Sequence, residues 1–145
     1  MIRAALFAAT LALANPASAE MVTRTVDGTF EDVAFGVESA IIGRGLVIDH
    51  VSHVGDMLER TRADVGATAT LFSAANIYQF CSASLSRKMM EADLANIRFC
   101  PYGVVVMATP DAPGKVTLGY NTMPEGAMQE VQSLLAEIVA EAAGD

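Results

Sequence analysis

The sequence of 145 residues is poor in several residue types that support common functions. It has no tryptophan, two histidines and two cysteines, and its nine Lys and Arg face 17 Asp and Glu, which gives a formal net charge of −8. A nucleic-acid-binding face needs clustered basic side chains that neutralise phosphates, and an anionic membrane surface attracts the same side chains. We therefore expect no nucleic-acid partner and no electrostatic attachment to a membrane.

Sequence motifs of the common enzyme classes are also missing. The chain contains no G-x-S-x-G, no P-loop and no H-E-x-x-H, so it lacks these signatures of hydrolases and phosphate-transfer enzymes. The absence of C-x-x-C disfavours a thioredoxin-type oxidoreductase, and the absence of C-x-x-C-H excludes covalently attached c-type haem. These absences favour a protein that is not an enzyme, without deciding the question.

The one long apolar run lies at the N-terminus. A short positive segment ending at Arg3 precedes the apolar stretch 4–14, and an A-x-A motif follows that ends at Ala19. This pattern is typical of a secretory signal peptide, and the run is shorter than the ~20 residues that span a bilayer. We expect residues 1–19 to be cleaved off and residues 20–145 to be exported, with the bacterial periplasm as destination. The alternative is a buried N-terminal helix.

Apolar periodicity after the signal segment predicts one α/β (α+β) domain over residues 20–145. Its hydrophobic content of 52% with 18% charged residues is too apolar for a disordered chain. Strand and helix patterns alternate in the order β-α-β-α-β-α-β-β-α, which predicts a mixed sheet of about five strands covered by helices. We expect strands at 21–26, 46–51, 77–80, 97–107 and 116–120, and helices from Thr29 to Gly43, from Ser52 to about Gly66, over 85–92 and from Pro124 to Ala142. The spacing of Thr29 and Asp32 resembles a capping box, which places the N-cap of the first helix at Thr29.

The two cysteines lie at corresponding places in the predicted pattern. Cys81 ends a strand at the entrance to a helix, and Cys100 lies in the next extended stretch. In an exported chain such a pair forms a structural disulfide, works in thiol exchange or ligand binding, or stays as two free buried thiols. All three remain open. We expect any pocket near these sulfurs, with Ser82, Pro101 and Tyr102 as candidate lining residues.

The region of the cysteines resembles a known family. Residues 80–93 (FCSASLSRKMMEAD), the Phe-Cys-Pro at 99–101 and the apolar strand at 104–107 are similar to the domain of unknown function 302 family, as are the segments 30–32 and 45–48. The resemblance implies a small sheet-and-helix domain of the TATA-binding-protein type that is often dimeric. The residues of the family pattern that match this sequence are Cys81 and Cys100, and the resemblance implies no activity.

The remaining candidate ligands for a metal are histidines and methionines. In a helix that starts near Ser52, His53 and Met57 are i, i+4 neighbours, and Met89 and Met90 add soft thioethers that suit copper or a non-covalent haem. These residues lack the tight spacing of a metal motif, and methionine mainly fills gaps in cores. We expect no cofactor, with copper or haem as the alternative.

The sequence therefore favours an exported, non-enzymatic accessory or binding domain. We expect a homodimer formed through an exposed sheet face or edge, and a periplasmic protein as a further possible partner. One alternative is a thiol-based redox or sulfur-handling protein in which Cys81 attacks and Cys100 resolves. The other is a copper- or haem-binding protein.

Overall fold

The computed structural model describes residues 20–145. The predicted signal segment and its cleavage after Ala19 lie outside the described residues. Within them, no helix is long and apolar enough to cross a membrane. The elements in chain order are β1 (Met21–Asp27), α1 (Phe30–Gly43), β2 (Val47–Ser52), α2 (Val54–Thr61), β3 (Ala74–Cys81), α3 (Ala83–Ala92), the 3₁₀ helix η1 (Leu94–Phe99), β4 (Tyr102–Ala108), β5 (Lys115–Asn121) and α4 (Gln129–Ala143).

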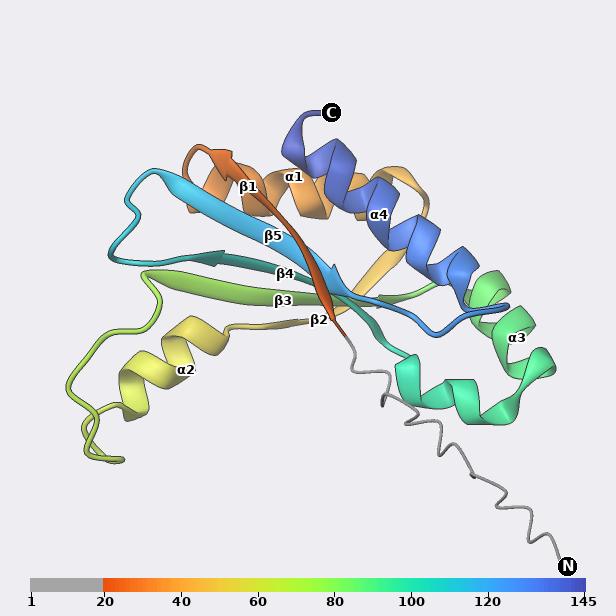
Figure 1. The fold of residues 1–145 in the computed structure, drawn as a ribbon, viewed down its shortest axis with the longest axis horizontal. Helices are drawn as coiled ribbons and strands as arrows, with labels where there is room; N and C mark the ends of the chain where they lie inside the picture. The colour runs from red at the N-terminus through yellow and green to blue at the C-terminus, as the bar shows by residue number, and fades with distance from the viewer. Residues whose placement is uncertain (1–19) are drawn as a thin grey trace, which may run out of the picture.

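The described strands form one five-stranded sheet in the order β1-β5-β4-β3-β2, drawn in Figure 1. The predicted α/β class and the order of the elements are confirmed. One detail of the prediction differs, because every strand pair is antiparallel and the sheet is not mixed. The connections that contain α2 and α3 each begin and end at the same end of the sheet. The strand that follows each connection therefore runs antiparallel to the strand before it. The α1 connection joins β1 to β2 at opposite edges of the sheet, so those strands never pair.

Helices α1 and α4 pack side by side on one face of the sheet and form the core with it (Figure 1). Each helix repeats apolar residues at 3–4 residue spacing, which gives it one apolar stripe that is buried against the strands. The Thr29 side chain accepts a hydrogen bond from the Asp32 N–H at 3.1 Å, as expected for the predicted N-cap of α1. Fully buried core side chains include Val37, Ile41, Phe80, Val104, Val106, Leu118, Val131, Leu135 and Ile138.

The boundaries of two predicted helices were wrong. Ser52 ends β2, and α2 begins after His53, which makes no side-chain capping bond. Helix α4 begins at Gln129, not at Pro124, because the Gln129 side chain instead donates to the carbonyls of Met123 and Pro124 and holds this segment in a turn.

The predicted strand over 97–107 was also wrong in its first part. The Asp93 side chain accepts a hydrogen bond from the Ala95 N–H at 2.9 Å, which starts the 3₁₀ helix η1 and delays β4 until Tyr102. The turn leaves Leu94 and Ile97 with 81% and 63% of their surface exposed.

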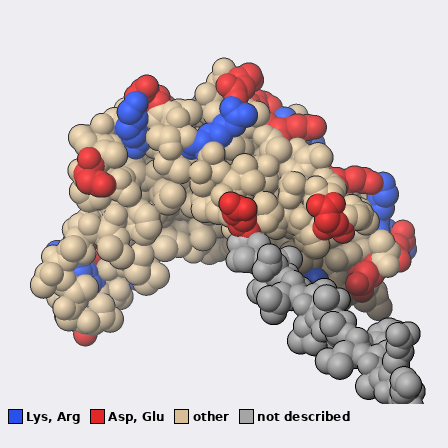
Figure 2. Space-filling view, in the orientation of Figure 1, with Lys and Arg blue, Asp and Glu red and all other residues tan. Residues whose placement is uncertain are grey.

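The second face of the sheet is not covered by α1 or α4, and we call it the open face. Since side chains alternate along a strand, Ile77 of β3 and Val105 and Met107 of β4 point to this face, where they are half-buried. Residues 54–73, which comprise α2 and the loop to β3, project beside it, and we call them the arm. In Figure 2 the arm extends below the sheet, and the hollow next to it is bordered by uncharged side chains.

Candidate functional site

A disulfide joins Cys81 and Cys100, with 6.5 Å between the two Cα atoms. Cys81 is the last residue of β3, and Cys100 directly follows η1, before the cis peptide bond to Pro101. Of the three possibilities for the cysteines, the structure contains the disulfide. The bond fastens the end of η1 to the end of β3, so it positions the chain that borders this end of the open face.

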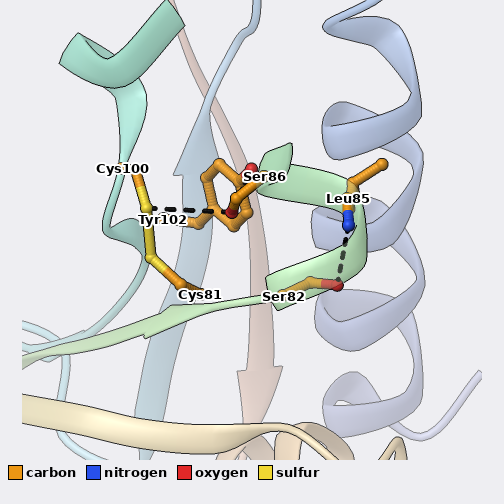
Figure 3. The surroundings of a disulfide bond; sticks show 6 residues. All are labelled: Cys81, Ser82, Leu85, Ser86, Cys100 and Tyr102. Atoms are coloured by element: carbon orange, nitrogen blue, oxygen red, sulfur yellow. Dashed lines mark hydrogen bonds between the residues drawn. A yellow bond between two sulfur atoms is a disulfide. The ribbon is translucent and has the colours of Figure 1, made fainter. Parts of the chain in front are cut away.

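The start of α3 packs against the disulfide, as Figure 3 shows. Ser82 is the N-cap of α3 and accepts a hydrogen bond from the Leu85 N–H at 3.4 Å. The Ser86 hydroxyl lies 3.0 Å from the Tyr102 hydroxyl and 3.8 Å from the Cys100 sulfur. Both Ser86 and Tyr102 are buried, so this hydroxyl pair satisfies two polar groups that water does not reach.

Beside the disulfide, the open face carries a hollow of about 430 Å³, which we call the η1 hollow. Its floor is apolar and comes from the middle of β3 and β4, where Gly103 has no side chain to fill it. Its wall comes from the end of η1 and the residues that follow. The lining residues are Ile77, Gln79, Arg98, Phe99, Pro101, Tyr102, Gly103, Val105, Asn121, Thr122 and Met123.

Three polar side chains border the η1 hollow and have unused hydrogen-bonding groups. The Arg98 guanidinium stacks over the Phe99 ring at 4.7 Å from its centre, and no carboxylate of residues 20–145 forms an ion pair with it. Within the same residues, the Gln79 and Asn121 side-chain amides form no hydrogen bond. An apolar concavity with a few convergent polar groups is the usual composition of a ligand pocket.

A second hollow, of about 470 Å³, lies on the arm between α2 and the loop that follows. Leu71 and Phe72 contribute to its apolar lining. Arg62, which lines this hollow, forms an ion pair with Glu59 and donates a hydrogen bond to the Thr68 carbonyl at 2.8 Å, so its guanidinium already has partners. This hollow therefore offers an apolar surface with little free polar capacity.

The structure places the three candidate pocket residues in different surroundings. Pro101 and Tyr102 line the η1 hollow, whereas Ser82 is occupied as the N-cap of α3 and does not line it. Sequence reasoning missed Arg98 and Gln79, which line the hollow from η1 and β3. No sequence motif contains both residues, because they belong to separate elements. The apolar pattern of residues 97–107 also predicted a single strand there, so the sequence did not indicate the turn that holds Arg98.

The four candidate metal ligands are not brought together. His53 and Met57 belong to the α2 end of the molecule, and His53 Nδ1 lies 3.0 Å from the Asn76 Oδ1. Met89 and Met90 lie on α3, beyond the other end of the sheet (Figure 1), and Met89 is a core residue with 1% exposure. Within residues 20–145, no three His, Cys, Asp or Glu side chains are grouped so that they could share a metal ion.

A chain of polar groups leads from His53 into the core. The Asn76 amide, which lies next to the His53 ring, donates to the Tyr78 hydroxyl at 3.3 Å. Burial raises the pKa of Tyr78 above its ordinary value of 10.0; the hydrogen bond from Asn76 acts in the opposite direction, and the nearby Glu38 carboxylate adds to the increase. Tyr78 therefore stays neutral across the physiological range.

Comparison with known proteins agrees with this architecture. The sequence profile of the family described as domain of unknown function DUF302 matches residues 22–144. The crystal structure of an uncharacterized conserved DUF302 protein from Bacillus stearothermophilus is similar in fold, with a TM-score of 0.60 and 16% identity over 86% of this chain and 93% of that chain. A search of curated proteins gave no match. Because the family profile covers nearly the whole described part, the chain belongs to the DUF302 family.

Proposed function

We propose that the protein is an exported, non-enzymatic accessory or binding domain that binds its partners through the open face. The observation that carries this proposal is the apolar centre of that face, formed by Ile77, Val105 and Met107 and left uncovered by α1 and α4. The exposed face of an antiparallel sheet is normally polar, and contiguous exposed apolar patches mark interaction sites. The binding partners are a second copy of the chain, a periplasmic protein, or a ligand in the η1 hollow.

Two features support export to an oxidising compartment. The N-terminal segment up to Ala19 has the pattern of a signal peptide, and the Cys81–Cys100 disulfide suits a compartment where disulfides persist. The bacterial periplasm meets both conditions. Intact mass of the protein recovered from that compartment tests the cleavage: a chain beginning at Glu20 supports export, and an uncleaved chain contradicts it.

The arm is the surface that we assign to the homodimer. Val65 and Leu71 project from it with 75% and 61% of their surface exposed. Residues 20–145 contain eight Lys and Arg and 17 Asp and Glu, a net charge of −9, so two copies repel one another and contact is least costly where few carboxylates meet. The adjoining strip of the open face presents Met107, Thr117 and Thr25, and Lys115, the one charged side chain that lines the same strip, pairs with Asp27.

The dimer assignment is tested by two matched substitutions of exposed apolar residues. Leu71→Asp places a carboxylate on the arm, and Phe35→Asp places one on α1, where Phe35 is 71% exposed. We expect a dimer in native mass spectrometry for the wild type and Phe35→Asp, and a monomer for Leu71→Asp. A monomeric wild type, or a dimer that survives Leu71→Asp, would contradict the assignment.

A second candidate is a thiol-based redox function, and it rests on the surroundings of the disulfide. Cys81 directly precedes the N-cap of α3, and a helix N-terminus stabilises a thiolate. The Ser86 hydroxyl lies 3.8 Å from the Cys100 sulfur, and both cysteines are half-buried. Fast reduction of the folded protein by dithiothreitol would favour this function, and resistance to reduction would exclude it.

A further inference from the structure

We infer that the η1 hollow binds a small arene carboxylate, whose carboxylate is recognised by Arg98 and whose flat apolar body lies on the floor of the hollow. This inference rests on the proposed function and deepens it by giving the chemical class of one ligand of the open face. It is carried by the unused polar groups and the apolar floor of the hollow together.

Arg98 is exceptional among the cations of this acidic protein. Six of the eight Lys and Arg side chains in residues 20–145 form ion pairs, and the two that do not are Arg60 and Arg98. Of these two, Arg98 lines the η1 hollow, and no carboxylate lines this hollow. A guanidinium that lacks an acidic partner retains its planar set of donors for a carboxylate ligand.

The neighbouring aromatic ring holds the guanidinium in place. The centre of the Arg98 guanidinium lies 4.7 Å from the centre of the Phe99 ring, within the range of cation–π contact. Such stacking uses one face of the guanidinium and leaves its N–H edge free. The disulfide at Cys100 fastens the next residue of the chain, so both side chains are attached to a fixed backbone.

Two amides add hydrogen-bond donors from the sheet. Gln79 of β3 is half-buried and Asn121 ends β5, and both line the same hollow as Arg98. Neither side chain has a hydrogen-bond partner within residues 20–145. Gln79 is half-buried and Asn121 is exposed, so both amide groups are accessible to a ligand in the hollow. A carboxylate oxygen accepts from a guanidinium and from amide N–H groups alike.

The floor fixes the apolar part of the ligand. Ile77 and Val105 face each other across β3 and β4, and Gly103, against which the Ile77 side chain packs, adds no side chain of its own. The hollow of about 430 Å³ falls within the ordinary range for small-molecule sites. An apolar body of one or two rings suits the apolar side chains of this floor.

The experiment compares 2-naphthoate with its neutral isostere 2-naphthamide, by calorimetric titration of the protein isolated from the periplasm. We expect the wild type to bind the acid at least tenfold more tightly than the amide. Arg98→Gln should remove this preference, whereas Arg60→Gln, which changes the other unpaired arginine, should leave it intact. Both arginines are exposed, and matching thermal unfolding of the two variants checks that each is folded.

Each remaining outcome overturns the inference. If acid and amide bind equally to the wild type, the hollow accepts an apolar body without selecting a carboxylate, and the proposed binding function stands without its anionic ligand. If Arg60→Gln abolishes the preference as fully as Arg98→Gln, the selection reflects overall charge and not the hollow. If neither compound binds, the hollow is not a site for this class, and the dimer test on Leu71 still decides separately whether the arm forms a homodimer.

Discussion

The Ser86 hydroxyl makes a contact on which a buried tyrosine depends. It lies 3.0 Å from the Tyr102 hydroxyl, and both residues are buried. We expect Ser86→Ala to lower the free energy of unfolding by about 1–3 kcal/mol, because it leaves a buried hydroxyl without a partner. Urea denaturation measures this, and Ser84→Ala, at an exposed position of α3, is the control with little expected change.

A double-substitution cycle separates this contact from the loss of a side chain alone. Replacing both partners, in Ser86→Ala with Tyr102→Phe, removes the unsatisfied hydroxyl, so the double variant should lose less stability than the two single losses added together. Strict additivity would show that the two hydroxyls do not depend on each other.

Tyr78 gives a prediction about pH. Burial holds its pKa above 10.0 in the folded protein, so the folded state keeps a proton that the unfolded state releases near pH 10. Its contribution to stability is therefore complete below pH 10 and is lost as the pH rises through the pKa of the folded protein. The free energy of unfolding of the wild type should fall more steeply above pH 10 than that of Tyr78→Phe; parallel curves would show that this tyrosine does not titrate as described.

At the residue scale, the sequence predicted what local pattern controls. The spacing of Thr29 and Asp32 indicated the α1 cap, and the position of the cysteines allowed the disulfide. The role of Arg98 could not be predicted from the sequence. Its capacity to bind a ligand depends on the absence of a nearby carboxylate and on side chains that β3 and β5 contribute to the same hollow.

At the scale of the elements, the close approach of α2 to β3 explains why the arm stays beside the sheet. A Cβ added at Gly55 would lie 2.6 Å from the Ala75 nitrogen, a contact that the backbone of β3 does not permit. We expect Gly55→Ala to push α2 away from β3 and to lower the free energy of unfolding by roughly 1–3 kcal/mol. Chemical denaturation measures the loss.

Gly43→Ala is the matched control for that substitution. Gly43 is the last residue of α1, and a Cβ there would meet nothing within 4 Å. Alanine favours the helix over glycine, so this variant should be neutral or slightly more stable. Equal losses in the two variants would show that the cost does not come from the contact between α2 and β3.

The disulfide acts on an element, since it anchors η1. Replacing Cys81 and Cys100 together by alanine should lower the free energy of unfolding by about 3 kcal/mol, as the chain-entropy model gives for a loop of this length. Urea denaturation of the wild type after reduction by dithiothreitol should show the same loss. A reduced protein as stable as the oxidised one would contradict this role.

Two of the wrong boundaries, the start of β4 and the start of α4, share a physical cause. Short side-chain bonds to the backbone, from Asp93 at η1 and from Gln129 before α4, override the apolar period in the neighbouring residues. Such bonds compete locally with strand and helix and leave little trace in hydrophobic pattern. The long stretches with apolar periodicity in α1 and α4 lie outside these bonds, and both were predicted as helices.

At the scale of the whole molecule, the sequence predicted the α/β class and the order of the elements but not which face of the sheet is covered. That depends on where each connection lies: α1 and α4 cross the sheet, whereas α2 and η1 lie at its margins (Figure 1). In the sequence, the half-buried Ile77 and Val105 cannot be distinguished from apolar core residues. Only the three-dimensional structure shows that they lie on the open face.

The most direct test of the open face is solvent access to its methyl groups in solution, measured by paramagnetic relaxation from a soluble probe. Ile77 and Val105 report on the face, and Ile42 of α1, which is 61% exposed, is the internal reference. We predict that Ile77 and Val105 become protected as the protein concentration rises through dimer formation, or when an arene carboxylate is added, while Ile42 stays accessible. Methyl groups of Ile77 and Val105 whose accessibility relative to Ile42 does not fall under any of these conditions would contradict binding through this face.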